Sequence, residues 1–209
     1  MSSRAHGSFA ATPALPCADD RSRSTAADDT LVVQLAAGSE TALARVYSEH
    51  SAEVRRFALR LVGDGAVAQD LVHEVFVRLP RAVRGFRVAG SLRAFLISMA
   101  VNQARHHVRG AARRRAHEGR HAREAPPSSA DHDPVEREQL ARALHCALDR
   151  LPLEQRVAFV LCEVEERSAV EAARIAGTSD GTMRARVFHA RRKLKTLLSE
   201  WRDDSEQPT

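Results

Sequence analysis

The 209 residues suffice for one large domain or two small ones. Three cysteines without a CxxC pair argue against a disulfide framework, and no apolar run approaches the roughly 20 residues needed to span a membrane. The first residues also lack the apolar core of a secretory signal, so we expect a cytoplasmic protein.

The formal net charge of +5 is unevenly distributed along the chain. Residues 81–125 carry 11 basic and 2 acidic side chains, residues 126–166 carry 4 and 9, and residues 167–209 carry 9 and 6. Nearly all the basic residues are arginines, which a GC-rich coding bias also explains. Such a bias does not explain two basic blocks separated by an acidic one. This distribution favours two surfaces that face a polyanion.

The N-terminal part of the chain predicts a leader followed by a helical domain. Residues 1–28 have no hydrophobic periodicity and are expected to be a disordered leader. Residues 29–115 show helical spacing, with a break at Gly63 and a new helix from Ala66. The apolar stripe of this second helix recurs every four residues, at Val67, Leu71, Val75 and Leu79. A further helix from Leu92 runs into the basic stretch.

Residues 116–134 contain three prolines and no aliphatic side chain larger than alanine, so we expect a flexible linker. Helical periodicity returns in residues 135–200, before an acidic tail at 201–209. The helix after Pro152 has four positions expected to be buried: Val157, Val160, Leu161 and Val164. No strand-like alternation is sustained, and the fold class expected is all-α, with two small helical domains.

The second domain has the layout of a helix-turn-helix. Ser168 and Glu171 form a capping box for a short helix that ends at Gly177, and a long helix begins near Ser179. One face of this long helix is expected to pack, through Met183, Val187, Ala190, Leu194 and Leu197. In such motifs the second helix enters the major groove of DNA, N-terminal end first.

These motifs resemble a known family. The segment from Leu151-Pro152 through Arg156 to Gly181-Thr182, Arg184, Arg186, Ala190-Arg191 and Leu194 is similar to region four of the extracytoplasmic-function (ECF) sigma factors. AQDLVHEVFVRLPRAVRGF (68–86) and SLRAFLISMAVNQARHHVR (91–109) resemble region two of the same family. The resemblance implies a non-enzymatic protein without cofactor or metal that directs core RNA polymerase to promoter DNA, and an anti-sigma factor as a further partner.

The resemblance also implies three sets of contact residues. A mixed acidic and apolar helix would dock on the polymerase through Asp70, Leu71, Glu74 and Phe76. The alternative for Leu71, as for Val75 and Leu79, is a place in the core, so Asp70 and Glu74 are the better candidates for contact. Cationic and polar groups would hold the melted minus-ten element: Arg87, Ser91, Arg93, Asn102, Arg105 and Arg109. The outer face of the long helix would read the minus-thirty-five element with Thr182, Arg184, Ala185, Phe188, His189, Arg191 and Arg192.

Two alternatives remain at this stage. A helix-turn-helix regulator that does not dock on polymerase explains the second domain but not the AQDLVHEVF helix. A metal-dependent enzyme or redox sensor would use the ten histidines and three cysteines, with His117 and His121 four residues apart. No HExxH motif accompanies that pair, and Cys146 and Cys162 fall at apolar helix positions typical of core thiols.

Overall fold

The computed structural model describes residues 26–85, 91–117 and 143–205, and this part of the chain is helical and contains no strand. Residues 143–149 form a short helix. The other helical elements are α1 (Ala26–Ala36), α2 (Glu40–Val62), α3 (Gly65–Ala82), η2 (Val83–Gly85), α4 (Leu92–His117), α6 (Leu153–Phe159), η3 (Val160–Val164), α7 (Ala169–Ala176) and α8 (Asp180–Ser205). The expected all-α fold is confirmed.

The first domain consists of α1 to α4. The predicted break after α2 is confirmed, because Gly63 adopts a left-handed conformation with φ 73° and Asp64 then caps α3 by accepting hydrogen bonds from the amides of Ala66 and Val67. The break between α1 and α2 had not been anticipated; there Ser39 caps α2. The first helix begins at Ala26, so three residues of the expected leader belong to it.

The second domain contains the expected helix-turn-helix. Ser168 and Glu171 form the capping box of α7, and Gly177 ends that helix with φ 63°. The face of α8 expected to pack is buried, with Met183 and Ala190 at 0% exposure. Val164 is 39% exposed, contrary to expectation. The reason is that η3 is a π-helical segment, whose wider turn rotates this position away from the core.

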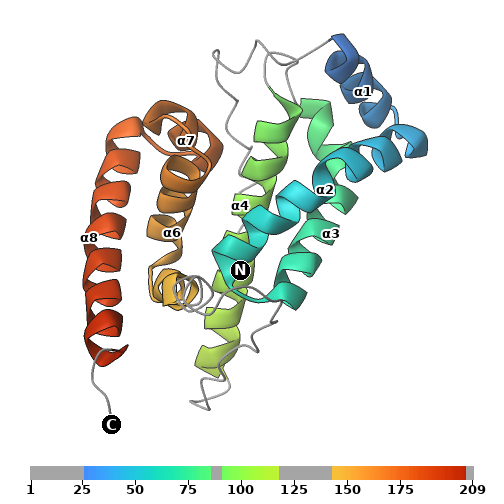
Figure 1. Ribbon diagram of the computed structural model, residues 1–209. Coiled ribbons are helices and arrows are strands. Elements are labelled where there is room, and N and C mark those ends of the chain that lie inside the picture. The colour runs from blue at the N-terminus through green and yellow to red at the C-terminus, as the bar shows by residue number, and fades with distance from the viewer. Residues whose placement is uncertain (1–25, 86–90, 118–142, 206–209) are drawn as a thin grey trace, which may run out of the picture.

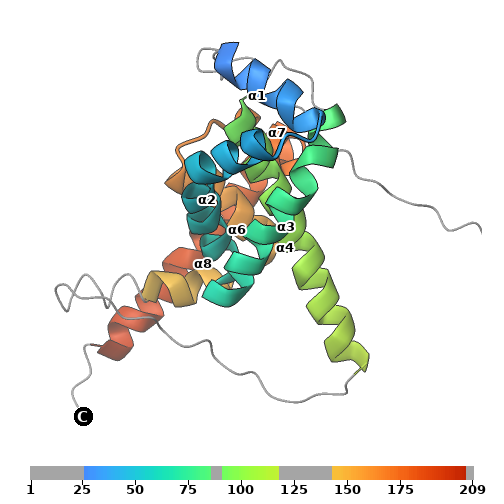
Figure 2. The same ribbon diagram turned by 90° about the vertical axis from the view of Figure 1, so that its right-hand side faces the viewer.

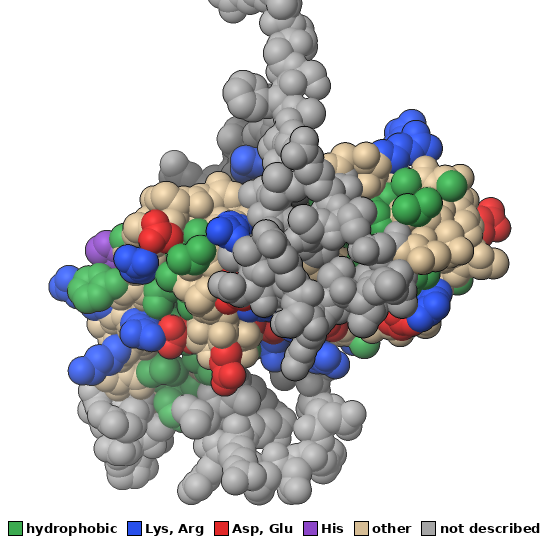
Figure 3. Space-filling view, turned by 90° about the horizontal axis from the view of Figure 1, so that it is seen from above, with side chains coloured by type: hydrophobic (Ala, Val, Ile, Leu, Met, Phe, Trp, Pro, Cys, Tyr) green, Lys and Arg blue, Asp and Glu red, His purple; other side chains and the backbone are tan. Residues whose placement is uncertain are grey.

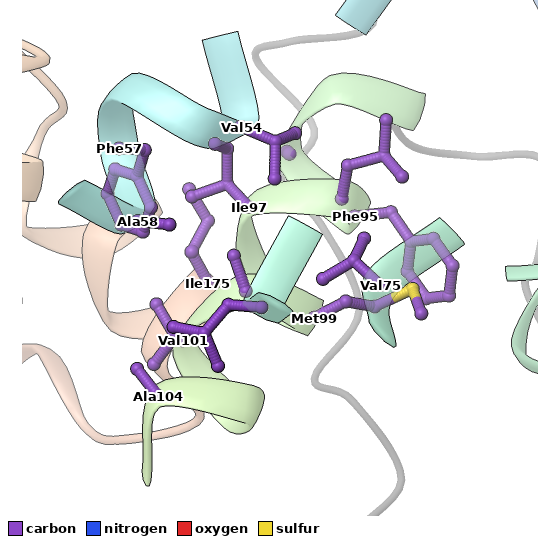
Figure 4. Packing of buried hydrophobic residues seen from close by; sticks show 14 of the residues in the cluster. Val54, Phe57, Ala58, Val75, Phe95, Ile97, Met99, Val101, Ala104 and Ile175 are labelled. Carbon is purple, nitrogen blue, oxygen red and sulfur yellow. The ribbon is translucent and has the colours of Figure 1, made fainter. Parts of the chain in front are cut away.

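The two domains pack directly against each other. In Figure 1, α6 and α7 lie between α8 and α4, and α7 contacts α4. Figure 2 shows the C-terminal part of α4 extending away from the other helices. One cluster of buried residues joins Val157 and Ile175 of the second domain to Phe57 and Ile97 of the first. Figure 4 shows Ile175 of α7 among the side chains of α2 and α4. The domains therefore share a core in this structure; the expected linker lies outside the described residues apart from 116 and 117, which end α4.

Arg156, from the motif that follows Leu151-Pro152, fixes this junction. Its side chain is 9% exposed and donates hydrogen bonds to the carbonyl oxygen of Leu61 and to Oδ1 of Asp149, both at 2.7 Å. It also donates to the backbone oxygen of Asp149 at 2.7 Å. Leu61 O belongs to the last turn of α2, where helix carbonyls lack partners and a cation is favoured. Arg156 thus connects the second domain to the C-terminus of α2.

Gly63 lies against the same junction, and its replacement by alanine is expected to destabilise the protein. A Cβ atom at this position would lie 2.5 Å from Oδ1 of Asp149, and φ is positive. The left-handed conformation alone costs an L-residue about 1–2 kcal/mol, and Asp149 would have to move. We expect Gly63→Ala to lower the midpoint of urea unfolding. Gly65→Ala, which meets no atom within 4 Å, is the matched control.

Candidate nucleic-acid and protein interfaces

The outer face of α8 is fully accessible. All seven residues predicted there are exposed: Thr182, Arg184, Ala185, Phe188, His189, Arg191 and Arg192. Phe188 is 62% exposed, and its ring meets that of His189 edge to face at 5.5 Å between centroids. Figure 3 shows basic, hydrophobic and histidine side chains together at the end of the molecule formed by α8. Exposure of an aromatic ring beside cations suits contact with bases and phosphates.

The start of α8 is built to present its side chains. The hydroxyl of Ser179 accepts a hydrogen bond from the amide of Thr182 at 3.2 Å and so caps the helix. Arg184 pairs with Asp180 one turn earlier at 2.8 Å, with 66% of its side chain exposed. Arg191 pairs with Glu163 at 2.7 Å and is 63% exposed. Pairs this exposed are weak, so both guanidinium groups are available to a stronger anion.

The acidic face of α3 has a different set of exposed residues from the predicted one. Asp70 is exposed, and Glu74 pairs with Arg78 at 2.6 Å on the surface. Leu71 and Phe76 are only 5% and 4% exposed, so both side chains belong to the core here, and their contact with polymerase stays a prediction.

The reason is the environment of α3, which packs against α2 and α4, so that its buried arc is wide. Phe76 also packs edge to face on Tyr47 of α2, at 4.9 Å between ring centroids. Val77, 57% exposed beside Glu74, was not predicted and completes the face. Val77 lies one helical turn from His73 and from Arg81, and this spacing on one polar face could have predicted its exposure.

The predicted minus-ten set is only partly accessible. Arg87 lies outside the described residues. Ser91 is 8% exposed, and its hydroxyl accepts a hydrogen bond from the amide of Ala94 at 3.4 Å at the start of α4. Its side chain caps the helix in this structure, and its contact with DNA stays a prediction. Asn102 is half-buried and accepts from Arg105 at 3.3 Å, whereas Arg109 is exposed.

Arg93 and Arg105 are occupied by carboxylates of the second domain. Arg93 pairs with Glu53 of its own domain and with Glu165 at 3.0 Å. Arg105 binds Glu154 with two nitrogens, at 2.7 and 2.8 Å. Arg60 of α2 also pairs with Glu165, at 2.9 Å. These three contacts between domains, Arg60–Glu165, Arg93–Glu165 and Arg105–Glu154, are named the interdomain ion pairs below.

Two groups at this junction have pKa values that their partners shift. Burial raises the pKa of Glu154, but its hydrogen bond and charge interaction with Arg105, together with Arg186 and Arg109, hold that pKa below its usual range. The hydrogen bond to Glu53 raises the pKa of Arg93 in spite of partial burial. Both shifts favour the charged forms of Glu154 and Arg93, in which the two groups form their ion pairs.

The residues considered for metal or redox chemistry form no cluster within the described part of the chain. Among the side chains that the structure describes, no three His, Cys, Asp or Glu are grouped as metal ligands would be. His121 lies outside the described residues, and only the backbone of His117 is described. Cys146 is exposed, so its prediction as a core thiol is wrong, while burial raises the pKa of the half-buried Cys162 thiol.

Comparison with known proteins assigns the two domains. Residues 46–114 match the family model of sigma-70 region 2, and residues 141–194 match that of sigma-70 region 4. The RNA polymerase sigma factor CarQ of Myxococcus xanthus is 32% identical over 165 residues, which cover 78% of this chain and 92% of CarQ. The ECF RNA polymerase sigma factor SigE of Mycolicibacterium smegmatis is 32% identical over 168 residues, 76% of this chain but 62% of SigE.

Solved structures show the same fold. The sigma factor RpoE, crystallised with the anti-sigma factor NepR from Bartonella quintana, has a TM-score of 0.63 at 24% identity and covers 74% of this chain and 95% of its own. CnrH, in complex with the cytosolic domain of CnrY, has a TM-score of 0.60 at 24% identity and covers 87% and 99%. None of the described helices has the length and apolarity to cross a membrane.

A helix-turn-helix regulator that does not dock on polymerase would not be expected to match sigma-70 region 2, as residues 46–114 of this chain do. Region 2 precedes region 4 in the chain, and the helix-turn-helix lies within the region 4 match. Both observations support the same assignment. The chain therefore belongs to the ECF sigma factors, transcription initiation factors that direct RNA polymerase to promoters and catalyse no reaction of their own.

Proposed function

We propose that three faces of this sigma factor divide the work of promoter recognition in the cytoplasm. The face of α3 with Asp70, Glu74 and Val77 contacts core RNA polymerase, the basic side of α4 holds the melted minus-ten strand, and the outer face of α8 reads the minus-thirty-five element. The observation that supports this most directly is that α8 buries one face completely and exposes every predicted DNA-contacting residue on the other.

The chemistry of the α8 face supports sequence-specific reading. Arg184 lies one turn into the helix, where a recognition helix meets base edges, and its guanidinium matches the two acceptors of guanine. Phe188 is one further turn along and offers an apolar edge to a thymine methyl group. Arg191 and Arg192 follow at the position where side chains of such a helix reach the phosphates.

Replacement of Arg184 by alanine tests this proposal. We expect at least about a fivefold loss of run-off transcription with core polymerase, since a bidentate base contact contributes about 1–3 kcal/mol of discrimination. The loss should depend on one base pair of the minus-thirty-five element, and selection from a randomised promoter pool should show relaxed preference at that position.

Lys195→Ala is the matched control. It removes the same charge from an exposed position about 16 Å further along α8. Its effect should be small and uniform across promoter sequences. An Arg184→Ala protein that loses activity equally on every promoter variant would contradict base reading by this residue.

We further propose an anti-sigma factor as a partner. RpoE and CnrH, which share this fold, were each solved with a protein partner, and in the RpoE structure that partner is an anti-sigma factor. A partner that covers the α3 and α8 faces would withhold both polymerase and DNA. Affinity purification of the full chain from its native host tests this: a protein bound to wild type should be displaced by core polymerase.

A further inference from the structure

Asp180, the first residue of α8, carries the carboxylate that pairs with Arg184. We propose that Asp180 is a positioning residue for promoter reading: it holds the Arg184 guanidinium in the orientation that donates to guanine, and so determines how strictly one base pair of the minus-thirty-five element is selected. This inference rests on the proposed role of Arg184 in base reading. It adds a residue on which the specificity of that contact depends.

The Asp180 carboxylate is itself held in place. Its Oδ1 accepts a hydrogen bond from the amide of Gly181 at 2.8 Å, and its Oδ2 accepts one from Nη2 of Arg184, also at 2.8 Å. The contact with the backbone restricts rotation of the carboxylate, because the Gly181 amide is part of the first turn of α8. The second oxygen therefore meets Arg184 from a defined direction.

The helix start does not need Asp180 as its cap. Ser179 accepts the hydrogen bond from the amide of Thr182 at 3.2 Å, and the hydroxyls of these two residues are 2.8 Å apart. A purely structural role for Asp180 would be attraction to the positive end of the helix dipole. Such attraction stabilises the helix but does not distinguish one promoter sequence from another, so base preference separates the two roles.

The pair leaves Arg184 able to read a base. A guanidinium has five N–H donors in one plane, and a guanine edge needs two of them, for N7 and O6. Guanine is neutral, so it does not compete for the positive charge as a phosphate would. The Asp180 and Arg184 side chains are 50% and 66% exposed, and their weak pair lies on the face that DNA would cover, where exclusion of water strengthens it.

An arginine held in advance should also be more selective. A free arginine side chain loses rotamer freedom when it binds a base, and a partner that fixes it beforehand reduces this cost. Without the carboxylate, Arg184 could turn to a neighbouring phosphate, whose contact carries no sequence information. Loss of Asp180 is therefore expected to lower discrimination rather than affinity.

The pair between Arg191 and Glu163 provides the contrast. Glu163 lies on η3, and its carboxylate meets Nη2 of Arg191 at 2.7 Å. Arg191 is about 10 Å beyond Arg184 along α8, where the proposed contact is a phosphate. The two acidic residues are thus alike in charge and in pairing with an arginine of α8. They differ in whether that arginine is proposed to read a base.

Base preference is measured with holoenzyme assembled from the full chain and core RNA polymerase. Each base pair of the minus-thirty-five element is replaced in turn in a fluorescent promoter DNA, and the ratio of the two Kd values gives the preference at that position. Asp180→Ala is expected to lower the preference about threefold to tenfold at the base pair that Arg184→Ala identifies, and at no other. Glu163→Ala, the matched control, should tighten binding to all these promoters by a similar factor and change no preference.

The double variant completes the test. In an Arg184→Ala background, Asp180→Ala should lower the preference at that base pair no further, because the side chain that it positions is absent. A preference lost at another base pair in this background would mean that Asp180 contacts DNA itself, and would overturn the proposal. Wild-type preference in Asp180→Ala, with a loss in Arg184→Ala, would overturn it and leave base reading by Arg184 intact. If Arg184→Ala changes no preference, base reading by Arg184 fails, and the positioning role fails with it.

Discussion

Arg156→Met is expected to lower the free energy of unfolding by about 2–3 kcal/mol, since hydrogen bonds to a charged group contribute about 1.5–3 kcal/mol and several are lost together. The substitution leaves Leu61 O without its donor and Asp149 without its counter-ion. Asp149 is 34% exposed, so water screens the charge that it keeps after its partner is removed. The loss of stability is therefore expected to be smaller than for a fully buried ion pair. Urea unfolding followed by far-ultraviolet circular dichroism measures the change.

The matched control for that prediction is Arg150→Met, which removes an arginine six residues earlier. Arg150 is 62% exposed and lies 3.7 Å from Glu200, so its loss should change stability by less than about 0.5 kcal/mol. Equal effects of the two substitutions would mean that the contact of Arg156 with α2 does not stabilise the fold.

Reversing both charges of the α3 face, Asp70→Arg with Glu74→Arg, is expected to weaken binding of core polymerase by at least tenfold. Asp70 is exposed and Glu74 is half-buried beside the exposed Val77, and opposite charges there would meet like charges on a complementary partner, which costs several kcal/mol. The measurement is a titration of labelled sigma factor with core polymerase, followed by fluorescence anisotropy.

Glu40→Arg with Glu49→Arg is the control for the polymerase prediction, because both positions are exposed on α2 and the net charge changes by the same amount. Circular dichroism should show intact helices in both double variants. Wild-type affinity in the α3 variant, or an equal loss in the control, would contradict polymerase docking by this face.

The local structure of the second domain followed directly from the sequence. The signals there are local: a capping box at Ser168 and Glu171, a glycine at 177 and an apolar repeat from Met183. Each acts within a few residues, so helix periodicity and helix-end signals suffice to predict the helix-turn-helix. The exposed face of α8 follows as the complement of its packed face. Its candidate residues therefore lie where the sequence placed them.

Contacts between segments distant in sequence were outside what the sequence predicts. Leu71 and Phe76 are buried because α2 and α4 cover a wide arc of α3, which the spacing of one helix does not reveal. The interdomain ion pairs join residues 49 to 105 positions apart, beyond the reach of any local pattern. Ser91 is a different case, because its position before Leu92 is a local signal for the helix cap that the structure shows.

The close approach of Gly63 to Asp149 limits how freely the two domains can be exchanged between relatives. Any side chain at position 63 would require a smaller residue at 149, and 149 also holds Arg156. The three positions are therefore expected to vary together in sequence, although they belong to different regions. A chimaera that joins this first domain to a second domain from another sigma factor should retain its junction only when positions 63, 149 and 156 come as a matched set.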